Sequence, residues 1–202
     1  MKKQAGLAAW NAGFMDGDGC ISQAIMEKES GDCDYTTTPA VHITNNYHSG
    51  LFDAEGNIEM RVMNQDGDFG VSPRCQIRQR ITECPIVSKL TKFAESIGVD
   101  YSVNNRSYGD GESQDQFAFA INGVNDVDCY LRELEPYLVV KKEQAQIMIE
   151  DIIPRLKRKD HHNRRGFLRL MRDVDRMNSM KGGNRGKYDL EYFEDLWEMS
   201  LD

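Results

Sequence analysis

The chain has 202 residues, with 25 Lys or Arg against 33 Asp or Glu and a net charge of −8. It is 40% hydrophobic and 29% charged, which is typical of a globular protein and fits one domain with an appendage. No apolar run approaches the roughly 20 residues of a membrane helix, and no signal-peptide core follows the N-terminus. The five cysteines are odd in number and contain no CxxC pair. We therefore expect a cytoplasmic protein with reduced thiols, neither secreted nor bound to a membrane.

The first third of the chain predicts one helix and one strand followed by an irregular segment. Leu7, Trp10 and Phe14 recur at spacings of three and four, which predicts a helix over 5–18. A strand is expected at 20–28. Residues 29–72 are rich in Gly, Asp, Asn and Thr without a helical period, so we expect a long loop and an extra hairpin, with candidate strands at 40–44 and 58–63. The first helix motif is not expected to recur, so the unit is predicted to occur once.

The rest of the chain predicts an α+β fold. Pro85 suits the first turn of a helix, and Gly109-Asp110-Gly111 is a hairpin signal. The order is α-β-β-α-β-β-α with added helices, which favours a sheet covered by helices on one face. The core is predicted at 1–154, with an insertion at about 29–72, and 155–202 as a basic, helical C-terminal extension. The elements expected here are strands at 74–81, 101–106 and 116–121 and helices at 85–97, 124–135, 141–153, 163–180 and 188–199.

Charge is distributed unevenly along the chain. Residues 155–172 hold eight Lys or Arg and one acid, whereas residues 22–70 hold two Lys or Arg and nine acids. In the strand at 74–81, three arginines share the parity opposite to the apolar Cys75 and Ile77: Arg74, Arg78 and Arg80. A cationic sheet face suits the backbone or a groove of a nucleic acid, and the plain alternative is a solvated surface.

Small residues recur every fourth position in the first predicted helix, at Ala5, Ala9, Gly13 and Gly17. They form one stripe, which permits close approach of another helix. Two glycines cost a helix about 1 kcal/mol each, and close packing would offset this cost. The expected partner is the same helix of a second protomer, which implies a twofold homodimer. Packing against another helix of the same chain is the alternative.

This helix ends at Asp16-Gly17-Asp18-Gly19, although the helix macrodipole disfavours acids at a C-terminus. Two such helices packed together would bring an Asp from each near the twofold axis. Carboxylates that lie close together need a cation between them, which predicts a site for Mg²⁺ (or Mn²⁺). Metal ions beside a phosphate can activate water and stabilise the leaving oxygen. The alternative is an Asp-Gly turn whose acids form local hydrogen bonds.

Three segments resemble one protein family. The residues NAGFMDGDG at 11–19 resemble the signature of the LAGLIDADG homing endonucleases, with Asn11 at a usually apolar position. LEPYLVVKKEQA at 134–145 resembles the segment entering the family's third helix, and IRQR at 77–80 resembles the end of its second strand. The resemblance covers 5–28 and 73–153. It implies an αββαββα fold with a saddle-shaped antiparallel sheet. It also implies a homodimeric, Mg²⁺-dependent endonuclease of the homing type that cuts double-stranded DNA at a long, near-palindromic site.

The resemblance also assigns roles to individual residues. It gives metal binding to Asp18 and the Gly17 carbonyl, and it places Asp16 at the helix interface with Ala9, Ala12, Gly13 and Gly17. Gln79 and Lys141 match polar residues around the attacking water, so Asp18, Gln79 and Lys141 are the expected catalytic residues. A lysine there can stabilise charge that develops on the phosphate. The strand residues expected to contact DNA in the major groove are Ser22, Lys28, Arg74, Gln76, Arg78, Arg80, Asn104, Arg106 and Gln116.

Other functions remain as alternatives. A maturase or regulator of the same fold would bind DNA or RNA without cleaving it. A structural protein that uses the first helix only to dimerise would show no salt-sensitive DNA affinity. An HNH nuclease around His161 and His162 is disfavoured because no His follows residue 162.

Overall fold

The computed structural model describes Trp10, Gly13 and residues 39–201 except 81–84, 107–115 and 182–185. Trp10 and Gly13 are helical, and the strand expected at 20–28 lies outside the described residues. The order α2-β1-β2-α3-β3-β4-α4 confirms the predicted α+β fold class. The elements are α2 (Pro39–Glu55), β1 (Gly56–Gln65), β2 (Asp68–Arg80), α3 (Pro85–Ile97), β3 (Ser102–Arg106), β4 (Gln116–Asn122), α4 (Val124–Leu134), the 3-10 turn η1 (Glu135–Tyr137), α5 (Lys142–Ile147), the π-helical η2 (Met148–Ile152), α6 (Ile153–Lys157), the 3-10 turn η3 (Asp160–His162), α7 (Arg164–Ser179) and α8 (Leu190–Trp197).

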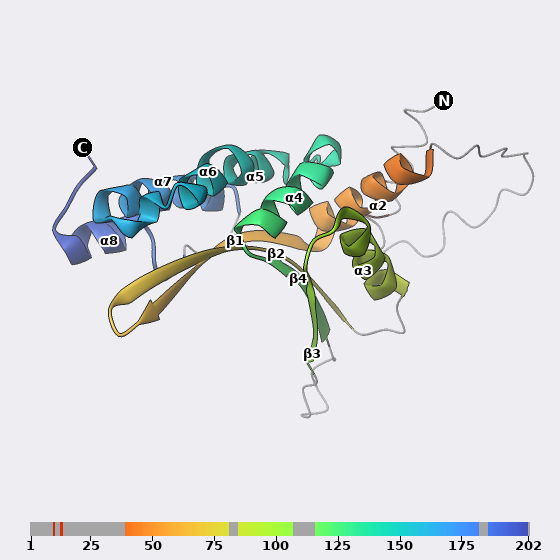
Figure 1. Ribbon diagram of the computed structural model, residues 1–202, viewed down its shortest axis with the longest axis horizontal. Coiled ribbons are helices and arrows are strands. Elements are labelled where there is room, and N and C mark those ends of the chain that lie inside the picture. Colours follow the sequence, from red (N-terminus) through yellow and green to blue (C-terminus); the bar gives the residue numbers. More distant parts are fainter. Residues whose placement is uncertain are drawn as a thin grey trace, which may run out of the picture.

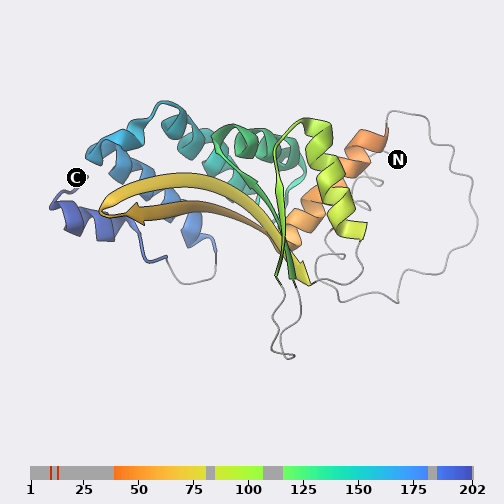
Figure 2. The same cartoon turned by 60° about the horizontal axis from the view of Figure 1, so that its bottom comes forward.

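The four strands form one antiparallel sheet in the order β1-β2-β4-β3. The β1–β2 turn is Asp66-Gly67, where both residues have positive φ and Asn64 Oδ1 accepts a hydrogen bond from the Gly67 N–H at 2.9 Å. In Figure 1 the β1–β2 and β3–β4 hairpins diverge and give the sheet an arched shape. Helices α4 to α7 lie on one side of the arch, and the rotated view in Figure 2 shows the same layering. Among the described elements, no helix covers the other face.

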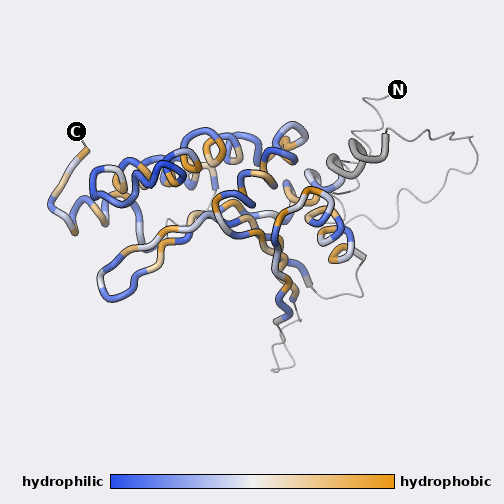
Figure 3. Tube along the Cα trace, viewed as in Figure 1, coloured by the Kyte–Doolittle hydropathy of each residue, from blue (hydrophilic) through white to orange (hydrophobic). Residues whose placement is uncertain are grey.

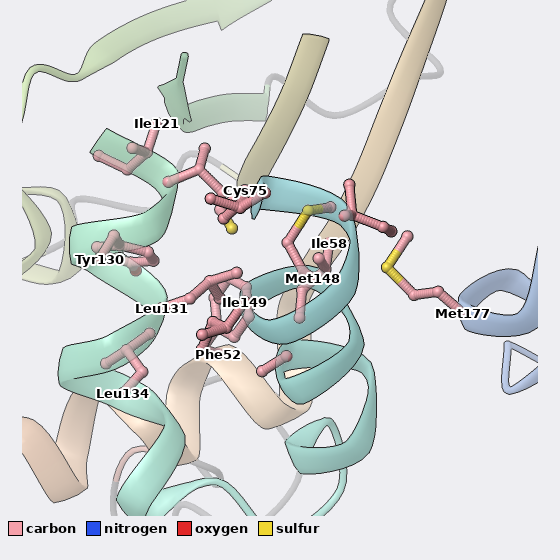
Figure 4. Packing of buried hydrophobic residues seen from close by; sticks show 14 of the residues in the cluster. Phe52, Ile58, Cys75, Ile121, Tyr130, Leu131, Leu134, Met148, Ile149 and Met177 are labelled. Atoms are coloured by element: carbon pink, nitrogen blue, oxygen red, sulfur yellow. The ribbon is translucent and has the colours of Figure 1, made fainter. Parts of the chain in front are cut away.

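The core lies between the sheet and this helical layer. Residues of alternate parity on β1, β2 and β4 face the helices and are buried, among them Ile58, Cys75 and Ile121. They meet helical residues such as Tyr130, Leu131, Met148 and Met177, seen from close by in Figure 4. Hydrophobic and hydrophilic stretches alternate along the helices in Figure 3, as expected for helices with one face on a core.

The far end of the β1–β2 hairpin is attached to the last helix. Phe69, two residues beyond the Asp66-Gly67 turn, packs edge-on against four aromatic rings at centroid distances from 4.9 to 6.5 Å. These rings lie in or just before α8: Tyr188, Tyr192, Phe193 and Trp197. Figure 2 shows the hairpin tip beside α8. This aromatic cluster joins the C-terminal helix to the sheet.

The expected loop and extra hairpin over 29–72 are wrong for the part that the structure describes. The candidate strand at 40–44 lies inside α2, whereas the one at 58–63 lies within β1 and is confirmed. The αββαββα unit therefore starts with α2 and β1 instead of the helix at 5–18 and the strand at 20–28. Residues 48–53 are all buried, polar ones included, because α2 has neighbours on several sides. A helix buried in this way has no amphipathic period to read from sequence.

The other described helices follow the predictions, with one difference at Pro154. The helix predicted to end before this residue continues through η2 into α6. Pro154 lies in the first turn of α6, directly after the π-helical segment. The backbone hydrogen-bond pattern changes there from π-helical to α-helical, and this change accommodates a residue without an N–H. No described helix is long and apolar enough to cross a membrane.

Candidate functional site

The end of α2 carries a second copy of the motif found near the N-terminus. Residues 50–56 read GLFDAEG, and residues 13–19 read GFMDGDG. At a constant offset of 37 residues, Asp16 matches Asp53 and Asp18 matches Glu55. The expectation that the motif occurs once is therefore wrong. The repeat was detectable from sequence, but Ala54 and Glu55 replace Gly and Asp in the copy.

Asp53 fastens the end of α2 to the loop before α5. The residue is 2% exposed, and its Oδ1 accepts the Lys141 N–H at 2.8 Å. Its Oδ2 accepts the Val139 N–H at 2.7 Å and the Trp10 Nε1–H at 3.1 Å. The Lys141 ammonium in turn donates to the Asp53 carbonyl oxygen. Two segments 86 to 88 residues apart in sequence are thus held together by one carboxylate.

Lys141 is a predicted catalytic residue, and the structure brings it to the second motif copy. It is the N-cap residue of α5 and is half-buried. Burial lowers the pKa of its ammonium below the ordinary value, and the negative charges of Asp53 and Glu55 oppose this effect. The negative end of the α2 dipole, at the C-terminus of that helix, also favours a cation at this position. A lysine therefore lies next to the acid-bearing end of α2.

A second lysine, which the sequence did not single out, comes from the C-terminal extension. Lys181 follows α7 and donates from its Nζ to the Ile58 carbonyl oxygen on β1. Burial lowers the pKa of the Lys181 ammonium. The charges of Glu59 and Cys75 act in the opposite direction and raise this pKa, whereas the positive charge of Lys141 lowers it further. The extension thus reaches the strand that directly follows Glu55.

A small cavity of about 170 Å³ lies beside the end of α2, lined by Glu55, Asn57, Glu59, Gln76 and Arg78. Asn57 Nδ2 donates to Glu59 Oε2 at 2.9 Å, and the Arg78 guanidinium donates to Gln76 Oε1 at 3.4 Å. Gln76 is 4% exposed, and its Nε2 has no hydrogen-bond partner in the described part of the molecule. The cavity therefore combines two carboxylates, a cation and an unused buried donor.

Strand register places the predicted strand contacts on one face of the sheet. Residues directly opposite in antiparallel strands share a face. Gln76 pairs with Ala120, and Arg78 pairs with Ala118, which pairs with Asn104. The last row joins Arg80, Gln116 and Arg106 by register. We call the face that carries these rows the open face, because no described helix covers it.

Arg74 shares the open face but is partly neutralised. It pairs with Asn122 on β4 and with Glu59 on β1 by register. Its guanidinium lies 3.7 Å from the Glu59 carboxylate, with 16% and 30% of the two side chains exposed. The open face is thus cationic along β2, with acids gathered at the end near α2.

Gln79 lies on the opposite parity from these rows. It is half-buried and pairs with Phe117, whose side chain is in the core. Because β1 begins at Gly56 opposite Ile77, Gln79 lies two positions past that start, next to the end of α2. Its catalytic role stays a prediction. Other predicted site residues lie outside the described residues: Ala9, Ala12, Asp16, Gly17, Asp18, Ser22 and Lys28.

The basic segment at 155–172 belongs to the helical layer. Three of its cations form ion pairs with acids of the same chain, at 2.6 Å between Arg155 and Asp173, 2.5 Å between Lys157 and Asp128, and 3.0 Å between Arg158 and Asp160. Arg155 and Asp173 are the most buried of these pairs. Part of the predicted positive charge therefore stabilises packing between helices.

Comparison with known proteins gave matches only among solved structures. No family model matches the sequence, and no curated protein matches it. The homing endonuclease I-CvuI, in complex with the I-CreI target in 2 mM Mg and with the DNA not cleaved, superposes with a TM-score of 0.64 at 18% identity. The match covers 78% of this chain and 94% of that one. I-CvuI has also been determined with its target in 2 mM Ca.

Two further similar structures show how much of the fold the chain contains. The archaeal intron-encoded homing endonuclease I-Vdi141I, complexed with DNA, gives a TM-score of 0.60 at 18% identity, covering 76% of this chain and 96% of that one. The LAGLIDADG homing endonuclease I-GzeII, in complex with its DNA target, gives 0.53 at 15% identity, covering 74% and 47%. The match covers nearly the whole chain of I-CvuI and I-Vdi141I, but about half of the chain of I-GzeII.

Proposed function

This chain has the fold of LAGLIDADG homing endonucleases, and on that premise we propose that it is a site-specific DNA endonuclease of the homing type. It hydrolyses phosphodiester bonds in a long, near-palindromic duplex site with Mg²⁺ or Mn²⁺. The observation that carries the proposal is the junction of α2 and β1. There Asp53 fastens Lys141 beside Glu55, at the edge of a cationic sheet face.

The open face is the proposed DNA-binding surface. Arg side chains can pair with guanine and Gln side chains with adenine through two hydrogen bonds each. Gln76 keeps its Nε2 donor unused inside the cavity, so a base acceptor can supply the missing partner. Ser22 and Lys28 remain proposed contacts from the first predicted strand.

The cavity residues fit a divalent metal ion. Mg²⁺ prefers oxygen ligands and is held by one or two carboxylates together with phosphates of the substrate. Glu55 and Glu59 would be these carboxylates, and Asp18 with the Gly17 carbonyl would be the matching ligands of the first copy. Among the described residues no group of three or more His, Cys, Asp or Glu could hold a metal. When bound, the metal would acidify a water and stabilise the leaving oxygen.

The reaction is hydrolysis of one phosphodiester bond per catalytic centre. A water oxygen bonds to phosphorus, one P–O ester bond breaks, and the water's proton ends on the leaving oxygen. The products are a phosphate monoester and a hydroxyl group. Lys141, held by Asp53, stabilises the negative charge that grows on the phosphate oxygens, and Gln79 helps to orient the attacking water.

Cutting both strands takes two catalytic centres. The described residues form one αββαββα unit, and a homodimer would supply a second one across a twofold axis that matches a near-palindromic site. In such a dimer a motif helix of each protomer packs against its copy.

The test begins with cleavage selection on a random duplex library in Mg²⁺, to obtain a target. On that target Glu55→Gln and Asp18→Asn are compared with Glu150→Gln, an exposed residue of the helical layer. We expect Glu55→Gln to bind DNA normally and to cleave at least about 100-fold more slowly. The Asp18→Asn variant shows whether the first copy also contributes an acid. EDTA should abolish cleavage.

Salt-sensitive DNA binding without any cleavage by the intact chain would contradict the nuclease and favour a maturase or regulator. Absence of salt-sensitive binding would contradict both, and would favour a protein that uses its helices only to assemble.

A further inference from the structure

Two residues of the N-terminal segment, Trp10 and Gly13, contact α2 within one chain. Gly13 is buried against α2, and a Cβ atom added to it would lie 1.8 Å from the Tyr47 carbonyl oxygen and 2.9 Å from the Leu51 backbone nitrogen. Tyr47 and Leu51 are four residues apart and therefore lie on one face of α2. Only glycine permits this approach, because any other side chain would overlap the α2 backbone. The glycine of the first copy thus packs backbone to backbone on the helix of the second.

Trp10 makes a second, independent contact to the same helix. Its Nε1 donates to Asp53 Oδ2 at 3.1 Å, so one carboxylate holds both Trp10 and the Lys141 loop. At the offset of 37 residues, Trp10 matches Tyr47 and Gly13 matches Gly50. The α2 residues that Gly13 and Trp10 contact, Tyr47 and Asp53, are the counterparts of Trp10 and Asp16, so the N-terminal segment packs on the motif-bearing stretch of α2.

The expected self-pairing of this small-residue helix across a dimer is at odds with the position of Gly13. A face of α2 that carries Tyr47 and Leu51 cannot pack on a second protomer while Gly13 occupies it. The described parts of residues 39–201 contain one sheet, and Lys141 is the lysine next to its motif helix. The chain covers 94% of I-CvuI but 47% of I-GzeII, as expected for a single unit.

We infer that the N-terminal motif copy is an intrachain substitute for the motif helix of a partner, which keeps the intact chain monomeric and makes it nick one DNA strand. This inference rests on the proposed nuclease function. One centre hydrolyses one phosphodiester bond, so a monomer leaves a nicked duplex. Displacing the substitute helix frees α2 to pack on a second chain, and the homodimer then cuts both strands.

The experiment combines sedimentation with cleavage of a supercoiled plasmid that carries the selected target. The intact chain should sediment as a monomer and should produce nicked circles at least ten times faster than linear DNA. Gly13→Leu removes the close approach without weakening the first helix, since Leu is a better helix former than Gly. This variant should dimerise with rising concentration and should increase the linear fraction at least tenfold. Gly186→Leu is the matched control, because a Cβ there meets nothing within 4 Å.

Trp10→Phe provides a milder variant in case Gly13→Leu folds poorly. It removes the donor to Asp53 and keeps an aromatic ring, and it should shift both readouts in the same direction. An intact chain that sediments as a dimer on DNA and converts supercoiled plasmid directly to linear DNA would overturn the inference. Absence of cleavage by every variant would overturn the nuclease proposal instead, and the sedimentation results would still test the substitute helix.

Discussion

Replacing Asp53 by Asn tests whether one buried carboxylate organises the site. The side chain accepts three hydrogen bonds, from the backbone of Val139 and Lys141 and from the indole of Trp10. Asn keeps the shape but turns one acceptor into a donor. The least costly orientation points the amide nitrogen at the Lys141 N–H, because this sacrifices one bond and keeps the two at Oδ2.

The magnitude follows from these contacts. One buried N–H left without an acceptor costs about 1–3 kcal/mol. The two remaining bonds lose the charge of their acceptor, which weakens each of them by roughly half. The sum is about 3 kcal/mol of unfolding free energy, or a Tm lower by roughly 6–12 °C in a chain of this size. Cleavage should fall further than stability, because the Lys141 loop is no longer fixed to α2.

The assay is thermal and urea unfolding followed by circular dichroism, with Asp100→Asn as the control. Asp100 is exposed, so its substitution should change the stability by less than about 0.5 kcal/mol. If Asp53→Asn unfolds like the control and cleaves DNA at the normal rate, the carboxylate does not hold the site together.

Three further predictions concern lysine and histidine residues near α2. Cleavage should decline as pH rises through the lowered pKa of Lys141, below the ordinary 10.5, because only the ammonium stabilises the phosphate charge; in Lys141→Arg the pH–rate profile should lose this decline. His48 stacks on Phe93 at 4.3 Å, and burial lowers its pKa from 6.5 to about 4, so the unfolded chain binds the extra proton between these pH values. Stability should therefore fall by about 3 kcal/mol between pH 6.5 and 4, and a His48→Leu variant should lack this part of the acid-induced loss in urea unfolding. Lys181→Met should weaken the attachment of the C-terminal extension, detected as faster hydrogen exchange in β1, and a variant with unchanged exchange would contradict the contact to Ile58.

Much of the fold was predictable because its signals are local. Pro85 at the first position of α3 and the alternation around Cys75 and Ile77 each specify an element without reference to the rest of the chain. The Asp66-Gly67 turn is an equally local signal, although it lies in the segment predicted to be an insertion. Helix α2 was missed because its burial on several sides removes the period that reveals a surface helix.

The site was only partly predictable, since its geometry depends on contacts between distant segments. The resemblance points to Lys141, but its anchor Asp53 lies 88 residues away, in a segment whose composition predicts a loop. Glu55 carries a weaker signal than Asp18, because Ala54 and Glu55 stand where the first copy has Gly and Asp. Lys181 carries no sequence signal at all, since its contact with β1 exists only once the helices have packed.

The aromatic contact between Phe69 and α8 links two segments that are more than a hundred residues apart in sequence. The final helix thereby supports the β1–β2 hairpin, which is one arm of the arched sheet. The position of this arm depends on contacts that lie outside the surface proposed to bind DNA. Substitutions in α8 should accordingly alter the length of duplex that the arm spans while leaving the base-reading side chains intact. Selectivity for target length can then change independently of selectivity for target sequence.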